Sequence, residues 1–458
     1  MLTPVKGLNR LNPLKIAVIG SGISGLSAAW LLSQRHDVTL FEAEQRVGGH
    51  SNTVDCQTAG GPIAVDTGFI VYNTATYPNL MALFDYLNVP TTPSRMGFGV
   101  SLHGGDYEYA GDTLMQVVGS FGNIATPGHW RMLWDIARFF RTAEAQSHYI
   151  DESVTLGEFL KAQGYSKAFM ERHLLPMAGA IWSSSPNQML DYPALSFLRF
   201  LGNHGLLKYN NRPQWRTVTG GSREYVQRLL DDSHLRALKG HPVHAVERSS
   251  SGVTVHAAFG FREQFDQVVI GTHADQALAM ISEPTREERH CLSAFRYGRN
   301  RAVLHRDASL MPRRRRLWSS WNYMAEESVH GQSSAVTYWM NALQPLPTTT
   351  NFFVSLNPQR EPAAGLVERE FSYEHPIFTA EAARMQKRLW GLQGRQRTWF
   401  CGAHFGAGFH EDGLQSGLAV AEQLSGMLRP WDVPDQSGRI HVMPSRSAAE
   451  PSHLEAAE

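Results

Sequence analysis

The sequence predicts an α/β fold in which a parallel sheet is assembled from both ends and the middle of the chain, with a second, α+β domain inserted between these segments. Three observations predict it. An apolar run at 15–20 leads through glycines into an apolar helix, a second strand follows at 37–42, and another strand, glycine turn and helix occupy 397–424. Alternation of strands and helices is typical of parallel sheets with helices on their faces.

The composition excludes several classes of protein. The 458 residues balance 42 Lys and Arg against 42 Asp and Glu, so no overall basic field exists to hold nucleic acid. Cys56, Cys291 and Cys401 are too widely spaced for a zinc motif or a disulfide framework, which fits a reducing compartment. No apolar run reaches the ~18 residues of a membrane span, and no signal peptide is evident. We therefore expect a cytoplasmic globular protein.

The first element is a strand at 15–20, followed by a helix over 21–32. Their junction reads Gly20-x-Gly22-x-x-Gly25, with Ser21, Ile23 and Ser24 at the intervening positions. The first glycine permits the tight turn, the second admits a pyrophosphate, and the third allows close packing of helix on strand. Glu42 ends the next strand about 20 residues later, where a ribose-binding carboxylate is expected. The sequence thus predicts a Rossmann-like dinucleotide site.

The residues after this acid narrow the choice of dinucleotide. They read Ala43-Glu-Gln-Arg46-Val-Gly48-Gly49-His50. At this point the chain resembles the FAD-dependent superfamily of amine oxidases, phytoene desaturases and protoporphyrinogen oxidases, in which an acid and then Arg-x-Gly-Gly extend the fingerprint along the cofactor. The resemblance implies FAD as the cofactor, with all of these residues except Glu44, Gln45 and Val47 among its expected contacts.

The far end of the chain carries a second part of the same resemblance. A strand over 397–401 meets a turn beginning at Gly402, and a helix follows through Gly413, Leu414 and Leu424. The resemblance implies that this helix points its N-terminus at the flavin pyrimidine ring, with the His410 amide as the nearest donor. In relatives an acid follows the first glycine, but here Ala403-His404 stands in its place.

The middle of the chain supplies the remaining predicted segments. A glycine pair at 220–221 precedes a helix, and in relatives a residue matching Val243 packs its backbone against adenine. We expect the FAD-binding domain to combine 14–90, 215–285 and 395–430. The substrate domain should comprise 91–214 and 286–394, and the Pro-, Ser- and Ala-rich stretch 432–458 should be disordered.

Further motifs sharpen the resemblance to a bacterial family of NAD/FAD-binding, amine-oxidase-like proteins. They are Asp66-Thr-Gly-Phe, Tyr77-Pro-Asn-Leu, Ile181-Trp-Ser-Ser, Asn203-His-Gly-Leu-Leu, Pro213-Gln-Trp-Arg and Phe409-His-Glu-Asp-Gly. The likeness covers nearly all of 14–427. It implies a flavoprotein, with fatty acyl or phospholipid chemistry suspected for some members.

Candidate catalytic residues follow from the resemblance. Amine oxidases flank the flavin with two tyrosines. Phe409 stands where one is expected, and the other falls near Tyr373 or His375. No second dinucleotide motif exists for NADPH, so we expect hydride transfer from substrate to flavin and reoxidation by oxygen, a quinone or another carrier.

Histidines and aromatic residues leave two interpretations open. His410, with His50, His204 and His404, either moves a proton or only hydrogen-bonds the backbone or cofactor. Six large aromatics either line an apolar substrate slot or pack an ordinary core: Trp182, Trp215, Trp318, Trp321, Tyr338 and Trp339. A metal site at 410–412 is rejected, because the spacing lacks a third ligand.

Two features raise the question of a membrane. Arg313–Arg316 next to Trp318 form a basic-aromatic cluster that could meet anionic headgroups. Apolar residues also recur at helical spacing at Trp130, Leu133, Trp134, Ala137 and Phe140. A solvated loop and a core-facing helix are the simpler interpretations, and they are preferred. Peripheral contact with the inner face of the membrane stays open.

Three functions remain after these steps. The leading hypothesis is an FAD-dependent oxidoreductase that dehydrogenates a small hydrophobic substrate, a fatty acyl chain or a membrane phospholipid. The second keeps the fold and makes it an amine oxidase. The third is a non-catalytic lipid-binding protein of the same fold, against which the complete dinucleotide motif argues.

Overall fold

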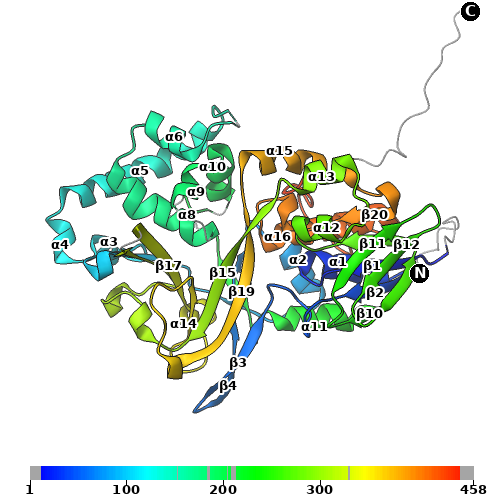
Figure 1. The fold of residues 1–458 in the computed structure, drawn as a ribbon. Coiled ribbons are helices and arrows are strands. Elements are labelled where there is room, and N and C mark those ends of the chain that lie inside the picture. Colours follow the sequence, from blue (N-terminus) through cyan, green and yellow to red (C-terminus); the bar gives the residue numbers. More distant parts are fainter. Residues whose placement is uncertain are drawn as a thin grey trace, which may run out of the picture. The chain divides into compact units, whose positions relative to one another are not determined.

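The computed structural model describes residues 12–151, 153–182, 186–203, 205–207, 213–328 and 331–443. The chain forms two compact units, whose elements are labelled in Figure 1. The first unit combines Met1–Gln45, Ser233–Leu292 and Met385–Glu458, and the second combines Arg46–Asp232 and Ser293–Arg384. Each unit therefore gathers segments that are distant in the sequence.

The first unit is built on a parallel sheet. Its strand order is β10 (Leu235–Leu238), β2 (Asp37–Phe41), β1 (Lys15–Ile19), β14 (Gln267–Ile270) and β20 (Thr398–Phe400). The central strands are almost wholly buried, as their unbroken apolar sequences predict for strands covered on both faces. The expected α/β class is confirmed.

Two helices of this unit pack directly against each other. They are α1 (Ile23–Ser33), buried along its whole length, and α16 (His410–Ser425). A Cβ atom at Gly417 would overlap the Ser24 carbonyl oxygen, and one at Gly413 would lie 2.8 Å from Ile23 Cγ2. The two glycines therefore permit the close crossing of the first and last long helices of the unit.

The rest of the first unit surrounds this sheet and helix pair. It contains an antiparallel sheet of β11 (Val243–Arg248), β12 (Val253–Ala257) and β13 (Phe261–Phe265), and the helices α12 (Ala274–Met280) and α13 (Arg286–Leu292). Helix α15 (Ala380–Leu389) contains the last boundary between the units.

The stretch after α16 is held by specific contacts. Arg439 Nε lies 2.5 Å from Asp412 Oδ1, Ile440 is buried, and Trp431 stacks on Trp30. The disorder expected over 432–458 therefore does not describe 432–443, because composition does not reveal these side-chain contacts. Residues 444–458 lie outside the part that the structure describes.

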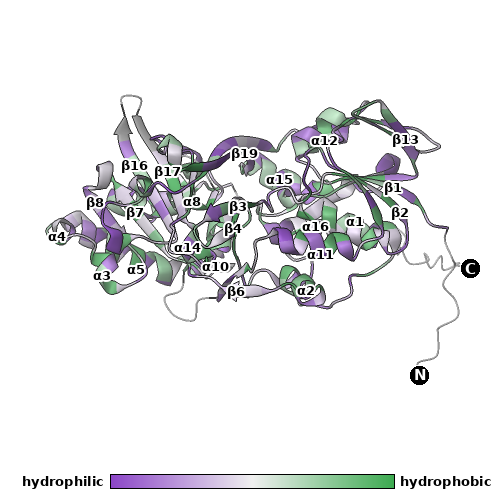
Figure 2. Ribbon diagram, turned by 90° about the horizontal axis from the view of Figure 1, so that it is seen from below, coloured by the Kyte–Doolittle hydropathy of each residue, from purple (hydrophilic) through white to green (hydrophobic). Residues whose placement is uncertain are grey.

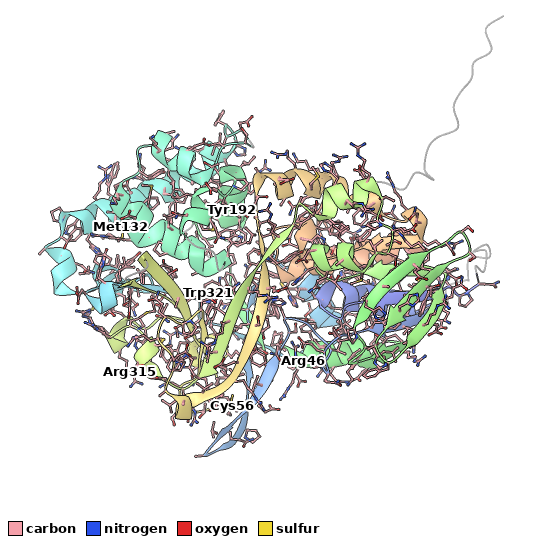
Figure 3. All side chains as sticks on the ribbon, viewed as in Figure 1. Arg46, Cys56, Met132, Tyr192, Arg315 and Trp321 are labelled. Atoms are coloured by element: carbon pink, nitrogen blue, oxygen red, sulfur yellow. The ribbon has the colours of Figure 1, made fainter. Side chains whose placement is uncertain are left out.

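The second unit is built on a seven-stranded mixed sheet. Its order is β19 (Val367–Ile377), β15 (Arg296–His305), β18 (Phe353–Leu356), β17 (Gly331–Trp339), β16 (Trp321–Ser328), β7 (Phe98–Leu102) and β8 (Tyr107–Ala110). The β7–β16 pairing is parallel and the others are antiparallel. Trp321, labelled in Figure 3, lies at the start of β16.

Smaller sheets and many helices complete the second unit. The strands are β3 (Thr53–Thr58) with β4 (Gly61–Asp66), and β5 (Tyr72–Asn73) and β6 (Thr91–Pro93) on either side of β9 (Trp215–Val218). The helices are α2 (Pro78–Tyr86), α3 (Leu114–Val118), α4 (Phe121–Ile124), α5 (Pro127–Ser147), α6 (Leu156–Ala162), α7 (Lys167–Phe169), α8 (Leu175–Trp182), α9 (Pro186–Leu190), α10 (Ala194–Asn203), α11 (Arg223–Asp231) and α14 (Met340–Leu343).

The unit boundaries differ from the expected domain boundaries in four segments, since 286–292 and 385–394, expected in the substrate domain, also fall in the first unit. Residues 46–90 and 215–232 were expected beside the dinucleotide motif, but they belong to the second unit. Their contacts explain this: Asp66 at the end of β4 accepts hydrogen bonds from Ser222 and from Gln344, both of the same unit.

Within the described residues, every helix is too short or too polar to span a bilayer.

Candidate cofactor and substrate site

The turn between β1 and α1 is shaped by its three glycines. Gly20 has φ +95°, and a Cβ there would lie 3.0 Å from the Gly271 carbonyl oxygen. A Cβ at Gly25 would overlap the Gly20 carbonyl oxygen, so α1 can sit on the turn only with glycine at this position. Around Gly22, by contrast, a Cβ would meet nothing within 4 Å. Protein atoms therefore fill the space around Gly20 and Gly25, whereas the space around Gly22 is free for a ligand.

The N-terminus of α1 is prepared for an anion. Gly22 precedes the helix, and no side chain caps its first amides. The amide groups of Ile23 and Ser24 belong to the first turn, whose N–H groups have no partner within the helix. A helix N-terminus of this kind attracts phosphate through its N–H groups and its dipole.

Glu42 is held beside this turn. Its carboxylate accepts hydrogen bonds from the Ser21 amide at 3.0 Å and from the Ser21 hydroxyl, and its other oxygen accepts from the Glu44 amide at 2.8 Å. The following residue, Ala43, continues the chain past the end of β2. The acid is therefore fixed where the sequence predicts a ribose contact.

The second glycine motif of this unit lies at the start of α16. A Cβ at Gly402 would run into the His404 ring, and the Gly402 amide donates to Ser416 Oγ at 2.9 Å. Asp412 accepts from the Phe409 amide at 2.7 Å and pairs with Arg439, while Gln415 donates to Glu411. The two acids are thus used in capping and packing.

Two histidines of the motif are neutral at physiological pH. Burial lowers the pKa of both His404 and His410 to about 3. A histidine with so low a pKa is a poor proton carrier near neutrality. His410 is the first residue of α16, so its backbone amide belongs to the first turn of a 16-residue helix, where amides have no partner within the helix. For His410, a role as a donor through its backbone amide is therefore favoured over a role of its side chain as an acid or base.

Val243 is the first residue of β11. The pairing of β11 with β12 is irregular there, with a register shift between Val243 and Ala245. The ladder of backbone hydrogen bonds is thereby interrupted at the residue whose backbone was expected to meet adenine.

In the second unit, the turn Arg46–His50 is also shaped by glycine. Gly48 and Gly49 have φ +121° and +56°. A Cβ at Gly48 would lie 2.9 Å from the Ser51 carbonyl oxygen, which accepts from Arg46 at 3.4 Å. His50 follows, and its carbonyl oxygen accepts from the Phe69 amide at 2.7 Å. The sequence extension thus forms a compact turn that requires glycine at Gly48.

Tyr373 lies on β19 in a closed hydrogen-bond network. Its hydroxyl is 2.7 Å from Thr67 Oγ1 and accepts from Asn52 Nδ2 at 2.9 Å. Thr67 donates its only proton to the Asn52 carbonyl oxygen, so Tyr373 donates its own proton to Thr67. The phenol is therefore anchored through its hydroxyl, and its ring lies 4.9 Å from the His50 ring.

His375, two residues further along β19, has a defined tautomer. The Arg301 amide donates to Asn357 Oδ1, so Asn357 Nδ2 donates to Asn300 Oδ1 at 2.8 Å. Asn300 Nδ2 then donates to His375 Nδ1 at 3.1 Å. Because a backbone N–H can only donate, each amide orientation follows from the one before it. Neutral His375 therefore carries its proton on Nε2.

The β15–β19 face around these residues carries no carboxylate. Directly paired residues share a face, and the pairs are Gly298 with His375, Asn300 with Tyr373 and Ala302 with Phe371. The His50 ring lies 5.5 Å from the His375 ring on the same side. We call these seven residues the β15–β19 face. It is built of aromatic, imidazole, amide and small side chains.

The sequence did not single out Asn52, Asn300 or Asn357, because isolated polar residues carry no pattern, and Thr67 appeared only within a family motif. Asp66 appeared only within a family motif, and it is fully buried. It accepts from Thr53, Gln344 and twice from Ser222. Burial nevertheless raises its pKa to about 6. Its position at the end of β4, two residues before Gly68, was the available signal.

Two of the six large aromatics are core residues, and the other four are half-buried. Trp182 and Tyr338 are buried, and Trp182 packs on Tyr192 and Phe200. Trp318 meets Trp339 edge to face at 5.6 Å, and Trp321 meets Tyr338 at 5.2 Å. Trp215 is partly exposed at the start of β9. His204 lies outside the described residues.

Comparison with known proteins identifies the family. The family model for flavin containing amine oxidoreductases matches residues 23–302, more than half of the chain. The chain belongs to this family. FAD is the cofactor of the family, and the expected resemblance is confirmed.

Individual relatives agree with this assignment. The chain is 29% identical over 258 residues to AofH of Mycobacterium tuberculosis, a protein named for flavin-containing monoamine oxidase, with 54% of each chain covered. It thus spans about half the length of that relative. Its fold matches a fatty acid isomerase from P. acnes (16% identity, TM-score 0.63, 92% and 99% covered) and cyclohexylamine oxidase from Brevibacterium oxydans (17%, 0.63, 90% and 99%).

The residues of the glycine turn in the first unit fit FAD. The open space at Gly22 and the uncapped amides of α1 suit a pyrophosphate, and Glu42 suits ribose hydroxyls. In the second unit, taken by itself, Gly48 and Gly49 form a turn with positive φ values. Among the residues that the structure describes, no three His, Cys, Asp or Glu side chains gather as metal ligands do.

Proposed function

We propose that this protein is an FAD-dependent oxidoreductase that dehydrogenates a hydrophobic substrate, a fatty acyl or phospholipid chain. The observation that carries the proposal is the β15–β19 face, which presents no carboxylate to attract an ammonium group. An apolar chain needs only such a surface to be positioned, because hydride transfer is chemistry that bound FAD supplies. A neighbour in fold is named a fatty acid isomerase, so the fold accommodates acyl substrates.

In this proposal the glycine turn of the first unit and the Arg46–His50 turn hold the cofactor. The expected contacts are Gly20, Ser21, Gly22, Ile23, Ser24, Gly25, Glu42, Ala43, Arg46, Gly48, Gly49, His50, Val243, Gly402, His410, Gly413 and Leu414. Phe409, Tyr373 and His375 would position the substrate. Oxygen, a quinone or another carrier would accept the electrons, and the protein would act in the cytoplasm or at the inner face of the membrane.

In this proposal Tyr373, His375 and Phe409 contribute different groups to positioning the substrate. Tyr373 would offer its ring, since its hydroxyl is engaged by Thr67 and Asn52. His375 would present an N–H from Nε2, since Nδ1 accepts from Asn300. Both residues would thus orient a substrate without taking a proton from it. Phe409 offers no hydroxyl, which suits an apolar chain better than an amine.

A second candidate is an amine oxidase. The relative AofH favours it, since its name refers to monoamine oxidase and the match covers more than half of this chain. A neutral amine could reach the flavin without a carboxylate. The two candidates differ in the substrate that reduces the flavin.

Anaerobic mixing separates the candidates. The purified holoprotein is mixed with acyl-phospholipids, free fatty acids, monoamines and polyamines, and the flavin band near ~450 nm is followed. We expect bleaching by a lipid, with a product that has lost two hydrogens and gained a double bond. Bleaching by amines alone would establish the second candidate. A colourless protein that binds lipid would mean a non-catalytic lipid-binding role.

A further inference from the structure

The second unit exposes an unusual group of large apolar side chains on three consecutive helices. Leu114 and Met115 on α3 are 87% and 76% exposed. Ile124 on α4 and Trp130 and Trp134 on α5 are about half exposed. We call these five residues the apolar ridge. Exposed apolar residues that occur singly are ordinary, but neighbouring ones mark interaction sites.

Contacts between the helices place the residues of the ridge on neighbouring elements of the unit. Helix α3 contacts α4, and α4 contacts α5, as their neighbouring positions in Figure 2 show. Trp130 Nε1 donates to the Ile124 carbonyl oxygen at 2.9 Å, which fixes the indole beside α4. The core side of α5 is made by other residues, including His129, Met132 and Phe139. Trp130 and Trp134 therefore do not serve the core, contrary to the preferred interpretation from sequence.

Arginines flank the ridge next to α3. Gln116 Nε2 of α3 donates to the Arg316 carbonyl oxygen at 2.9 Å, and the Arg316 guanidinium donates to the Gly119 carbonyl oxygen at 2.7 Å. Arg315, labelled in Figure 3, lies over the Trp318 ring at 5.3 Å. The solvated loop expected from sequence is thus confirmed as exposed at Arg313, Arg315 and Arg316, but it borders an apolar surface.

The acids near this surface balance only part of its charge. Asp106 pairs with Arg313 at 3.5 Å, with both side chains mostly exposed, and Asp112 is exposed beside α3. Arg314 is neutralised by the buried Glu108. On α5, Arg131 pairs with Asp135 and also lies 4.7 Å from the Trp134 ring. The guanidinium groups of Arg315 and Arg316 contact a ring and a carbonyl group, and both remain exposed.

We propose that the apolar ridge and the flanking Arg313, Arg315 and Arg316 dock this protein on a bilayer that contains anionic lipids. Leu, Met and Trp side chains gain by leaving water for the acyl boundary, and Trp prefers the headgroup level. Arginines beside them attract anionic headgroups. The occupant is the lipid surface, since the ridge offers protruding side chains with basic neighbours. The proposal adds to the proposed function the surface that would contact the membrane, and it is tested without turnover.

Vesicle flotation with the full-length holoprotein tests the surface. Vesicles of phosphatidylcholine alone are compared with vesicles in which part of the lipid is phosphatidylglycerol. We expect binding to the anionic vesicles that weakens as salt is raised. The variant Leu114→Ser/Met115→Ser should bind at least about tenfold less, and Arg315→Ala/Arg316→Ala should lose the dependence on anionic lipid.

Matched controls remove equally exposed apolar groups elsewhere. Phe259 and Leu428 of the first unit are 88% and 76% exposed, so Phe259→Ser and Leu428→Ser should leave binding unchanged. Unfolding curves establish that each variant is folded. Absence of binding to anionic vesicles, or binding that survives the α3 variant, would overturn the proposal. So would dimers that the α3 variant dissociates, because a second copy would then cover the ridge. Flavin reduction by lipid in detergent would still support the proposed function if docking failed.

Discussion

The glycine turn of the first unit and the β15–β19 face of the second are built in opposite ways. The turn is made by backbone: Gly20 has φ +95°, a Cβ at Gly25 would overlap the Gly20 carbonyl oxygen, and Gly22 leaves open space. The face is made by side chains whose orientations depend on Asn52, Asn300 and Asn357, which are far apart in the sequence. A site formed by backbone atoms therefore tolerates few substitutions, whereas a network of side chains can be altered by one substitution at a time.

The largest effect is expected in the turn. In Gly25→Ala the new methyl group would overlap the Gly20 carbonyl oxygen, which must shift together with β1 or α1. We expect a loss of about 3 kcal/mol in the free energy of unfolding, measured by urea denaturation. Gly365→Ala is the control, because a Cβ there meets nothing within 4 Å. Equal stability of the two variants would mean that the turn is not closely packed.

A smaller effect concerns a buried histidine of the second unit's sheet. Burial lowers the pKa of His305 to about 4 from its ordinary 6.5. The folded protein therefore resists protonation that the unfolded chain accepts, so stability is lost as pH falls from about 6.5 to about 4. His305→Gln should reduce this loss by about 2 kcal/mol, measured by urea denaturation at several pH values. The exposed His148→Gln should keep the full pH dependence.

The tautomer of His375 should respond to a single atom. In Asn300→Asp a carboxylate oxygen replaces the donor Nδ2, so Nδ1 of the imidazole should become protonated. We expect the Nε2–H form to fall from dominant to minor, a change of about 1.4 kcal/mol or more. Nitrogen NMR of labelled histidine reports the two forms. Ser372→Ala, on the opposite face of β19, should leave the signal as it is. An unchanged tautomer in Asn300→Asp would disprove the amide chain.

The smallest effect is expected from the phenol hydroxyl. Tyr373→Phe removes hydrogen bonds with Thr67 and Asn52 and should cost about 1 kcal/mol of stability. If only the ring positions substrate, the rate of flavin reduction should change less than about threefold. Tyr373→Leu, which also removes the ring, should slow reduction further. A large rate loss in Tyr373→Phe would instead assign proton transfer to the hydroxyl.

The comparison also explains what could be predicted from the sequence. The glycines of the turn, Glu42 and the start of α16 were predictable, because the spacing of such residues along the sequence indicates a particular backbone conformation. Residues 46–90 grouped with the second unit through the contacts of Asp66, which no local pattern encodes. The face of α5 was also misjudged, since helical spacing does not say which stripe of a helix meets the core. Networks of side chains that are distant in the sequence can be recognised only once the fold is known.

Gly22→Ala tests the central claim most directly, because it separates cofactor binding from folding. A Cβ at this position meets no protein atom within 4 Å, so the variant should unfold with the same free energy as the native chain. The flavin content of the two purified proteins is then compared by visible absorbance after incubation with FAD. The account predicts a yellow native protein with one FAD per chain and a variant that retains little or none. An equally yellow variant would contradict it, as would a native protein that takes up no flavin.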